Sequence, residues 1–290
     1  MYRLFAFLAV LAFSAAAVTS ATSPDRPDTV SFTLQPESTS GQIKARFYRD
    51  DNQTWSTRFS ATDLSGLDVD RFHAAGSGPV QVALVREAGR LDCAGRGGDS
   101  EASGSCRFAS DPDFLAFLDR HGIERPDDKD EFALVAVDAR RSLVEALDAA
   151  DYPTPDVDKL IALAALGVDS AYIADLARAG YRPSTLDVLV QFKALGISAD
   201  FIRGFASGGY GDLSPEELVQ FRALGIDAGY IAGFERLGYR DLDVHELVQL
   251  KALGITPDDV RSFQRDGESL PSPEKLVRMR ALGHMFGARR

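Results

Sequence analysis

The 290-residue chain has no excess of positive charge: 32 Lys and Arg residues stand against 43 Asp and Glu residues, for a formal net charge of −11. A protein that binds nucleic acid through a basic face needs the opposite balance, so we expect no nucleic-acid partner. The chain is 45% hydrophobic and 26% charged, which is an ordinary globular composition. It excludes a disordered or collagen-like chain.

The sequence also lacks complete catalytic motifs. There is no GxSxG segment and no GK[ST] phosphate-binding loop. Residues 245–249 (HELVQ) fall short of the zinc-binding HExxH motif, because Gln249 stands where the second histidine is needed. Residues 272–275 (SPEK) match the SxxK of serine acyltransferases, but the accompanying KTG is absent and Ser272 falls at an expected helix N-cap. We expect a protein that is not an enzyme, with no cofactor and no metal.

Two further segments have simple structural interpretations. The acidic run 127–131 (DDKDE) lacks the alternating ligands and central glycine of a calcium-binding EF-hand loop, and we interpret it as a solvated linker. The segment 208–211 (GGYG) ends a helix rather than holding a phosphate. The four histidines, at positions 73, 121, 245 and 284, form no cluster in the sequence.

Residues 1–21 have the layout of a secretory signal peptide. Arg3 precedes an apolar run of about 15 residues, and small residues follow it, so we expect cleavage after Ala21, with Ala17 as the alternative. An uncleaved anchor is the competing interpretation, but the run is short for a bilayer span, which needs roughly 17–25 residues. Residues 22–28 then form a linker. We expect a periplasmic or secreted bacterial protein with no membrane span after cleavage.

The two cysteines, Cys93 and Cys106, flank a segment rich in Gly, Ser and Asp, and the arms on either side resemble a β-hairpin. In an oxidising compartment a disulfide between them is the expected state. Closing a loop of this size stabilises the fold by about 3 kcal/mol in the chain-entropy model. The alternative is a redox-active or metal-binding thiol pair, for which CxxC spacing and a nearby histidine are missing.

Residues 29–125 predict a small antiparallel β-sheet domain with a terminal helix at 111–120. Apolar residues alternate with polar ones in four segments, which are separated by Gly, Pro, Asn and Asp clusters. The alternating sets are Val30/Phe32/Leu34, Ile43/Ala45/Phe47, Trp55/Thr57/Phe59 and Val80/Val82/Leu84. With the cystine hairpin this makes about six short strands, which favours an antiparallel meander. We expect Trp55 and the phenylalanines to lie in the core.

Residues 153–290 contain a regular repeat. A Leu-Gly pair recurs five times at one constant spacing, at 166–167, 195–196, 224–225, 253–254 and 282–283. A Gly-Tyr pair recurs at the same spacing, at 180–181, 209–210 and 238–239. Exact periodicity of this length is typical of stacked helical repeats. The predicted fold class is therefore α+β: a small antiparallel sheet followed by an α-solenoid of 29-residue helical hairpins.

The repeat also predicts where its two helices begin. Residues with side-chain oxygens, which cap helix N-termini, precede the first helix at Asp156, Thr185, Ser214, Asp243 and Ser272. They precede the second helix at Asp169, Ser198, Asp227 and Thr256. Residues 126–152 align one period upstream as a degenerate repeat or junction, with Asp138 and Asp151 in place of the two glycines. The alternative makes 132–137 a last β-strand.

Parts of the chain resemble a known family. The segments LVQFKALGISADFIRGFASGGY and LVQLKALGITPDDVRSF, with SGPVQVALVREAGRLDCAGR upstream, are similar to the extracytoplasmic sheet-plus-repeat region of BlaR1-type sensor metallopeptidases. The resemblance covers roughly residues 29–290 and implies an extracytoplasmic sensor-like or scaffold-like module. The peptidase part, with its membrane helices and HExxH motif, has no counterpart in this sequence.

One polar pattern runs through the repeats and is our candidate binding surface. Glutamines recur once per repeat period, and basic residues recur two positions further on. The stripe consists of Gln191, Gln220 and Gln249 with Lys193, Arg222, Lys251 and Arg280. Stacked repeats place such positions along one face, and extended faces of repeat arrays bind partners. We expect this stripe to contact an extended or acidic partner, either a protein or an envelope polymer. The alternative is that it only solvates the outer face.

The function predicted from the sequence is recognition or scaffolding outside the cytoplasm, with envelope sensing or signalling as one form of it. The alternative class is an envelope hydrolase with a carboxylate site at the junction of sheet and repeats. A converging pair of acids in a deep cleft would favour the hydrolase, and a shallow groove would favour binding. A purely structural spacer would show neither feature.

Overall fold

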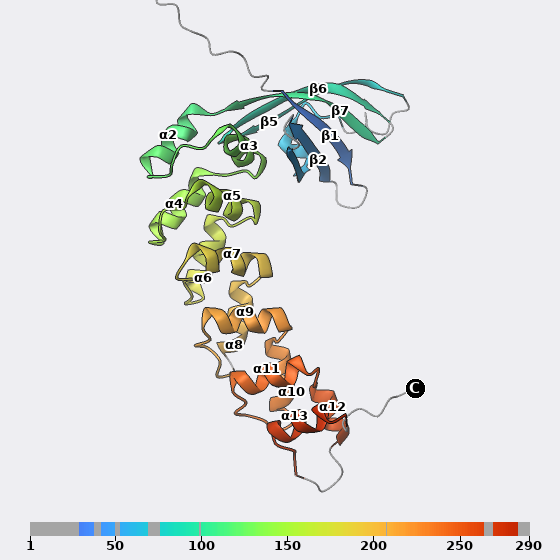
Figure 1. The fold of residues 1–290 in the computed structure, drawn as a ribbon, viewed down its shortest axis with the longest axis vertical. Coiled ribbons are helices and arrows are strands. Elements are labelled where there is room, and N and C mark those ends of the chain that lie inside the picture. Colours follow the sequence, from blue (N-terminus) through green and yellow to red (C-terminus); the bar gives the residue numbers. More distant parts are fainter. Residues whose placement is uncertain are drawn as a thin grey trace, which may run out of the picture.

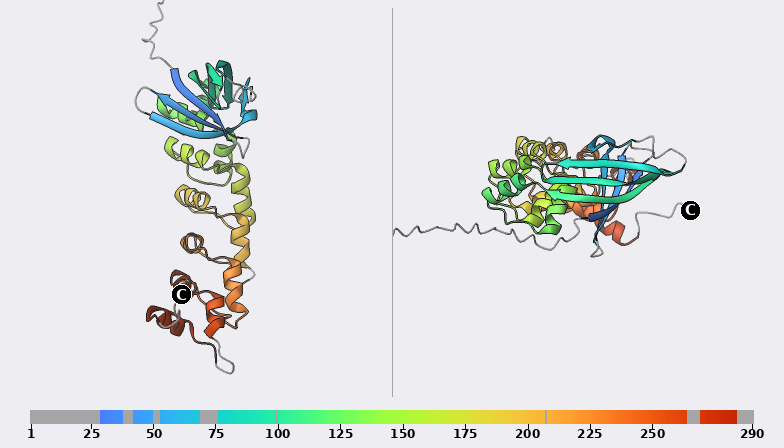
Figure 2. Two further views of the ribbon diagram at one scale, coloured as in Figure 1. Left: turned by 90° about the vertical axis from the view of Figure 1, so that its right-hand side faces the viewer. Right: turned by 90° about the horizontal axis from the view of Figure 1, so that it is seen from above.

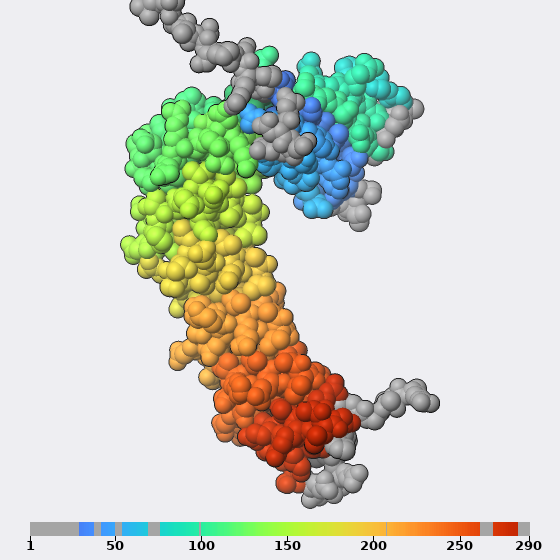
Figure 3. Space-filling model, in the orientation of Figure 1, coloured from blue at the N-terminus to red at the C-terminus, as the bar shows by residue number. Residues whose placement is uncertain are grey.

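The computed structural model describes residues 29–37, 42–49, 53–68, 76–98, 100–206, 208–263 and 269–283. The predicted signal peptide at 1–21 and the linker at 22–28 lie outside the described residues. The chain forms an elongated molecule, with a β-sheet at one end and helices that follow one another away from it (Figure 1). The space-filling view shows the sheet set to one side of the helical column (Figure 3).

The period-two segments form an antiparallel sheet of seven strands. Its strands are β1 (Thr29–Pro36), β2 (Gln42–Arg49), β3 (Gln53–Ser60), β4 (Leu64–Ser65), β5 (Gly78–Arg86), β6 (Gly89–Gly98) and β7 (Glu101–Ser110). The order across the sheet is β3-β2-β1-β7-β6-β5-β4. The predicted simple meander is therefore wrong at one place, because β1 pairs with β7, its first and last strands.

The reason for this order lies between β3 and β4. These strands form opposite edges of the sheet, yet only the three residues of the 3₁₀ helix η1 (Ala61–Asp63) connect them. Four peptide steps span at most about 15 Å. The sheet must therefore curl until its two edges approach each other, which encloses one face as the core. Alternation within each strand places Val30, Phe32 and Leu34 on that face, each no more than 2% exposed.

Helix α3 (Asp128–Ala136) fills the curled sheet. Phe132 is fully buried, and its ring centroid lies 5.8 Å from that of Phe47, 4.6 Å from that of Trp55 and 5.5 Å from that of Phe108. The alternative of a strand at 132–137 is thus wrong. A short, continuous apolar run does not distinguish a buried strand from a buried helix, since neither needs a polar face.

The acidic run at 127–131 was predicted to be a solvated linker, but it forms the start of α3. Asp127 is the N-cap of α3, and its carboxylate accepts hydrogen bonds from the backbone N–H groups of Lys129 and Asp130, both at 2.9 Å. The rest of the run forms the first turn of the helix. Acidic side chains are favourable there, because the exposed N–H groups carry partial positive charge.

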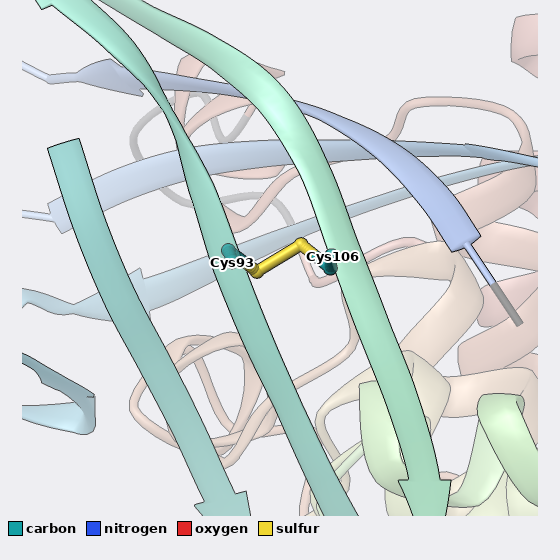
Figure 4. Close-up of a disulfide and its surroundings, with 2 residues drawn as sticks. All are labelled: Cys93 and Cys106. Atoms are coloured by element: carbon teal, nitrogen blue, oxygen red, sulfur yellow. A yellow bond between two sulfur atoms is a disulfide. The ribbon is translucent and has the colours of Figure 1, made fainter. Parts of the chain in front are cut away.

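The cystine hairpin is longer than predicted. Cys93 in β6 and Cys106 in β7 face each other in register and form the disulfide shown in Figure 4. The strands continue beyond them to Gly98 and from Glu101, so most of the segment predicted as a loop is strand. At Gly95 a Cβ atom would lie 2.1 Å from the Ser103 carbonyl oxygen. Glycine is required here by close backbone approach, not by a loop.

The helices after the sheet lie in two columns (Figure 2). They are α2 (Pro112–Arg120), α3, α4 (Arg141–Ala149), α5 (Val157–Ala165), α6 (Ser170–Arg178), α7 (Leu186–Leu195), α8 (Ala199–Ala206), α9 (Pro215–Leu224), α10 (Ala228–Glu235), α11 (Val244–Ala252), α12 (Pro257–Phe263) and α13 (Pro273–Ala281). In one column, α3, α5, α7, α9, α11 and α13 contact each other in succession. In the other, α6 contacts α4 and α8, and α12 contacts α10.

Helix starts recur at the predicted positions. Asp156, Thr185, Ser214, Asp243 and Ser272 are the N-caps of α5, α7, α9, α11 and α13. The glycines after the first helices, Gly167, Gly196, Gly225 and Gly254, have φ between 65° and 72°. Asp138 and Asp151 also adopt left-handed φ values, 59° and 52°. They lie one repeat period before Gly167 and Gly180, so the upstream segment has the same turns built from aspartate, which tolerates this conformation better than most residues.

Within the described ranges, no single helix is long and apolar enough to cross a membrane. Helices α5 and α6 reach the required length and composition only as a pair, and this pair is bent by 80°. Both helices bury apolar side chains against their neighbours, including Leu160, Leu163 and Leu176.

Candidate functional site

The basic residues of the predicted stripe pack against the preceding helix pair. The Lys193 ammonium lies 4.2 Å from the ring centroid of Tyr172, and the Lys251 ammonium lies 4.3 Å from that of Tyr230. At these distances the cation is attracted by the ring face, which contributes about 0.5–1 kcal/mol at an exposed site. Each lysine thus ties one helix pair to the one before it.

The arginines of the stripe bind the carbonyl ends of helices. Arg222 Nε donates to the Leu195 carbonyl oxygen at 2.8 Å, and Arg280 Nε donates to that of Leu253 at 2.9 Å. Both carbonyls lie at the C-terminal ends of first helices, where backbone acceptors lack intrahelical donors and carry partial negative charge. Arg222 also lies over the ring of Phe201, at 5.2 Å. The basic residues of the stripe therefore contact the preceding helix pair within the stack.

The glutamines of the stripe are arranged differently. Gln191 and Gln220 are exposed, while Gln249 Nε2 lies 2.7 Å from His245 Nε2, one helical turn away. The structure thus divides the predicted surface into cations with intrachain partners and glutamines that mostly face solvent. That the stripe contacts a partner stays a prediction. The aromatic residue that recurs 21 positions before each of Lys193, Arg222 and Lys251 was the sequence signal for the intrachain role.

Tyrosines form a second set of connections, which the sequence analysis missed. The hydroxyls of Tyr172 and Tyr230 donate to the carbonyls of Ile197 and Ile255, both at 2.7 Å. Burial raises the pKa of both phenols well above their ordinary value. These tyrosines therefore stay protonated and act as neutral donors, holding the turn of the next helix pair.

The junction of sheet and helices holds arginines and carboxylates. The Arg86 guanidinium donates to the carbonyls of Val135 and Ala136, at 2.6 and 2.9 Å, and lies 3.5 Å from an Asp138 oxygen. Burial lowers the pKa of Arg86, and the negative charge of Asp138 opposes that shift. This contact fastens the last residues of α3 to strand β5.

A second arginine at the junction, Arg141, lies between two carboxylates. Its guanidinium nitrogens are 3.5 Å from Glu87 and 3.5 Å from Asp111. The Arg141 backbone N–H also donates to Glu87 at 2.9 Å. Asp138, Glu87 and Asp111 are therefore each engaged by a guanidinium group, in an arrangement that joins the sheet to α3 and α4.

The outer face of the sheet carries an open groove of about 580 Å³. Its floor is formed by residues that face away from the core on four neighbouring strands. Ala83, Asp92, Arg107 and Thr29 lie side by side in register across β5, β6, β7 and β1. Gln81 and Ser105 lie in the adjoining row, and Ser65 of β4, which pairs with Ala83, lines the groove together with Gly66. We call this surface the outer groove.

Charge in the outer groove centres on Arg107. Its neighbour Asp92 forms an ion pair with Arg90, whose pKa is raised by that hydrogen bond. Arg107 itself is exposed and has no hydrogen-bond or ion-pair partner among the described residues. The floor therefore offers one available guanidinium beside the hydroxyls of Thr29 and Ser105. Arginine in such a setting binds carboxylates with two parallel hydrogen bonds.

Ser272 of the SxxK match and the GGYG segment have structural roles. The Ser272 hydroxyl accepts the N–H of Lys275 at 3.3 Å and so caps α13. Gly209, with φ of 82°, belongs to the turn that ends α8. Across the residues that the structure describes, no group of three or more His, Cys, Asp or Glu side chains is placed to hold a metal ion. Comparison of the sequence with protein-family models and with curated proteins finds no match.

Proposed function

We propose that this protein is an exported, non-enzymatic recognition module that binds an extended acidic segment of a partner protein in its outer groove. The observation that carries this proposal is the position of Arg107. Arg107 lines a groove of about 580 Å³, and its guanidinium has no hydrogen-bond or ion-pair partner in the described part of the chain. A carboxylate of the partner would supply the missing counter-ion.

The shape of the outer groove supports an extended ligand. The groove crosses several strands, and its floor presents a guanidinium, an amide and small hydroxyl side chains instead of large apolar ones. Such a surface suits a polar segment whose backbone and carboxylates can be hydrogen-bonded along its length. Asp92, held by Arg90, adds a negative charge to the floor next to the positive charge of Arg107. The two opposite charges favour one direction of the bound segment over the reverse direction.

The helices form the second part of the proposal: a solenoid of 29-residue helical hairpins that serves as a stiff arm. Its support is the recurrence of caps, left-handed turns and cation contacts at the same spacing. The degenerate segment 126–152 would be its first hairpin, joined to the sheet by Arg86. A recognition surface carried at one end of such an arm fits the sensor-like or scaffold-like role that the resemblance to BlaR1-type proteins implies.

Export is the third part. The disulfide between Cys93 and Cys106 is compatible with an oxidising compartment such as the periplasm or the extracellular space. The predicted signal peptide at 1–21 would direct the chain there. Mass spectrometry of the protein recovered from the periplasm of an expressing bacterium tests this directly. An N-terminus at residue 22 is expected, and an intact N-terminus in the membrane fraction would contradict it.

The binding proposal is tested by charge reversal within and outside the outer groove. Arg107→Glu should abolish binding to a fluorescent peptide pool rich in Asp and Glu. Arg46→Glu is the matched control, because Arg46 is exposed on the same sheet face but lies outside the groove. Binding by the unaltered protein should also weaken with salt, since exposed charges are screened over about 10 Å at 0.1 M ionic strength.

Two results would contradict the proposal. Equal binding by the Arg107→Glu and Arg46→Glu proteins would show that the groove does not select the ligand. Equal binding of acidic and neutral peptide pools would show that charge does not. Affinity capture from envelope extract with the same three proteins then identifies the natural partner, which should be retained by the Arg46→Glu protein and lost by the Arg107→Glu protein.

A further inference from the structure

Three gaps between successive helix pairs are filled in the same way. An aromatic ring from the second helix of one pair meets a basic side chain from the first helix of the next. The ring–cation pairs are Tyr172 with Lys193 at 4.2 Å, Phe201 with Arg222 at 5.2 Å and Tyr230 with Lys251 at 4.3 Å. Both members of each pair recur once per repeat period, so the three gaps are equivalent places in the stack.

The gap nearest to the sheet, between α3–α4 and α5–α6, lacks both groups. Leu143 stands one repeat period before Tyr172, and Ala164 stands one period before Lys193. Alanine and leucine fill less space than the basic and aromatic side chains at the equivalent positions of the other gaps. A cavity of about 420 Å³ lies in this gap. We call it the first slot. It is lined by Val137, Asp138, Leu143, Ala164, Val168 and Asp169, among others.

The ring is missing from the first slot, but the carbonyl group that binds the cation elsewhere has a counterpart there. Val137 follows the last residue of α3 and corresponds in position to Leu195, whose carbonyl accepts from Arg222. The carbonyl end of a helix carries partial negative charge and attracts cations. The first slot therefore keeps the acceptor end of the contact and lacks the donor.

Two carboxylates add negative charge to the first slot. Asp169 Oδ1 accepts the Tyr172 N–H at 2.7 Å, while Oδ2 has no hydrogen-bond partner in the described ranges. Asp138 is held by Arg86 and by Arg140, which also lines the slot. Because Arg140 is tied to Asp138 through two nitrogens, the Asp169 oxygen is the carboxylate acceptor that remains for an incoming cation.

We propose that the first slot receives a basic side chain, arginine or lysine, from a partner protein, in the place that Lys193, Arg222 and Lys251 occupy in the other gaps. The incoming cation would bind the carbonyl end of α3 and the Asp169 carboxylate, and its aliphatic stem would pack on Leu143 and Ala164. This site is separate from the outer groove and selects the opposite charge. It therefore goes beyond the proposed function and does not depend on Arg107.

The first test titrates the whole protein with N-acetyl-arginine amide and, in parallel, with N-acetyl-citrulline amide, which has nearly the same shape without the charge. Isotope-labelled protein reports the location through the backbone signals of Ala164, Gly167 and Val168. We expect saturable shifts of these signals with the arginine compound and at least tenfold weaker binding of the citrulline compound.

Variants then locate the site. Ala164→Arg restores the side chain found in the equivalent gaps and should abolish binding of the arginine compound while raising the melting temperature. Ala164→Leu fills the slot without charge and should also abolish binding. Asp169→Asn keeps the helix cap, because asparagine caps as well as aspartate, and should weaken binding at least threefold. The Arg107→Glu protein should bind the arginine compound unchanged, so failure of the outer groove is distinguishable from failure of the slot.

Several outcomes would overturn the proposal. One is the absence of any saturable shift at millimolar concentrations of the arginine compound. Equal affinity for the arginine and citrulline compounds would show that the slot does not select cations. Unchanged binding by both Ala164 variants, with folding verified by circular dichroism, would place the ligand elsewhere.

Discussion

The Gly-Tyr tyrosines offer a matched test of how polar groups contribute to the helical stack. Tyr210 Oη donates to the Leu242 carbonyl at 2.5 Å, and Tyr239 Oη donates to that of Pro271 at 2.6 Å. Tyr181 holds the same position one period earlier, but its Oη is buried without a hydrogen-bond partner within the part of the chain that the structure describes. The Tyr181 hydroxyl thus lacks the acceptor that the hydroxyls of Tyr210 and Tyr239 have.

Replacing each tyrosine by phenylalanine should therefore have opposite effects. A made hydrogen bond contributes about 1 kcal/mol net, whereas a buried hydroxyl without a partner costs about 1–3 kcal/mol. On this basis we expect Tyr239→Phe to lower the free energy of unfolding by about 1 kcal/mol and Tyr181→Phe to raise it by about 1 kcal/mol. The ring contacts stay, since Tyr181 stacks on Phe192 at 5.4 Å and Tyr239 meets Phe234 at 5.9 Å.

The assay is urea unfolding followed by circular dichroism in the far ultraviolet, with Tyr210→Phe as a second hydrogen-bonded case. A difference of about 2 kcal/mol between Tyr181→Phe and Tyr239→Phe is well above the error of such measurements when the slopes agree. Equal destabilisation by all three substitutions would refute the reasoning, because it would mean that the Tyr181 hydroxyl also has a favourable partner.

The same residues predict a dependence on pH. Burial raises the pKa of Tyr181 to about 12, with Glu216 and Glu217 adding to the shift, and burial raises that of Tyr239 to about 12. The unfolded chain loses these protons near pH 10 and the folded chain only near pH 12. Ionisation of these tyrosines therefore takes no stability from the fold below pH 10, and it lowers the free energy of unfolding progressively as the pH rises from 10 to 12. The Tyr181→Phe protein should lose less stability over this interval than the unaltered protein.

Two further predictions concern the disulfide and the repeated turns. Cys93→Ser should lower the free energy of unfolding by about 3 kcal/mol, because the disulfide closes a loop with a sequence separation of 13 residues. Urea unfolding of the unaltered protein after reduction should show the same loss. A free energy of unfolding equal to that of the oxidised, unaltered protein would contradict the prediction. Gly225→Ala should destabilise the protein by about 1 kcal/mol, since its φ is 70°. Gly204→Ala is its control within a helix: a Cβ there meets Ala228 at an ordinary 3.5 Å, so the thermal midpoint should rise by a few degrees. The same sign for both glycines would contradict the assignment of Gly225 to a left-handed turn.

Local patterns predicted most of the secondary structure correctly. Period-two alternation located the long strands, and capping residues located the helix starts after residue 155, because caps and left-handed glycines act on backbone groups within a few residues. The errors occurred where local signals conflict. The apolar run at 132–137 suits a buried strand as well as a helix, and the glycine-rich segment between the cysteines resembles a loop although it is strand.

The candidate sites were much less predictable. The stripe of glutamines and cations was visible as a period, but a period does not say whether a polar side chain meets solvent or the neighbouring helix pair. Arg222 binds a carbonyl 27 residues earlier in the chain, and that contact exists only once the pairs are stacked. The sequence analysis did not single out Arg107, because its significance comes from its neighbours on two other strands, Thr29 in β1 and Asp92 in β6.

By itself, the sequence determined that this chain has a sheet portion with a disulfide, followed by short helices that begin and end at a constant period. These features depend on short-range hydrogen bonding and on the side-chain period of each element. Only the tertiary structure decided that β1 pairs with β7, that α3 enters the curled sheet and that one gap in the helical stack is left open. Those outcomes depend on which surfaces meet across long separations in sequence, and there the fit of volumes and charges, not local preference, selects the arrangement.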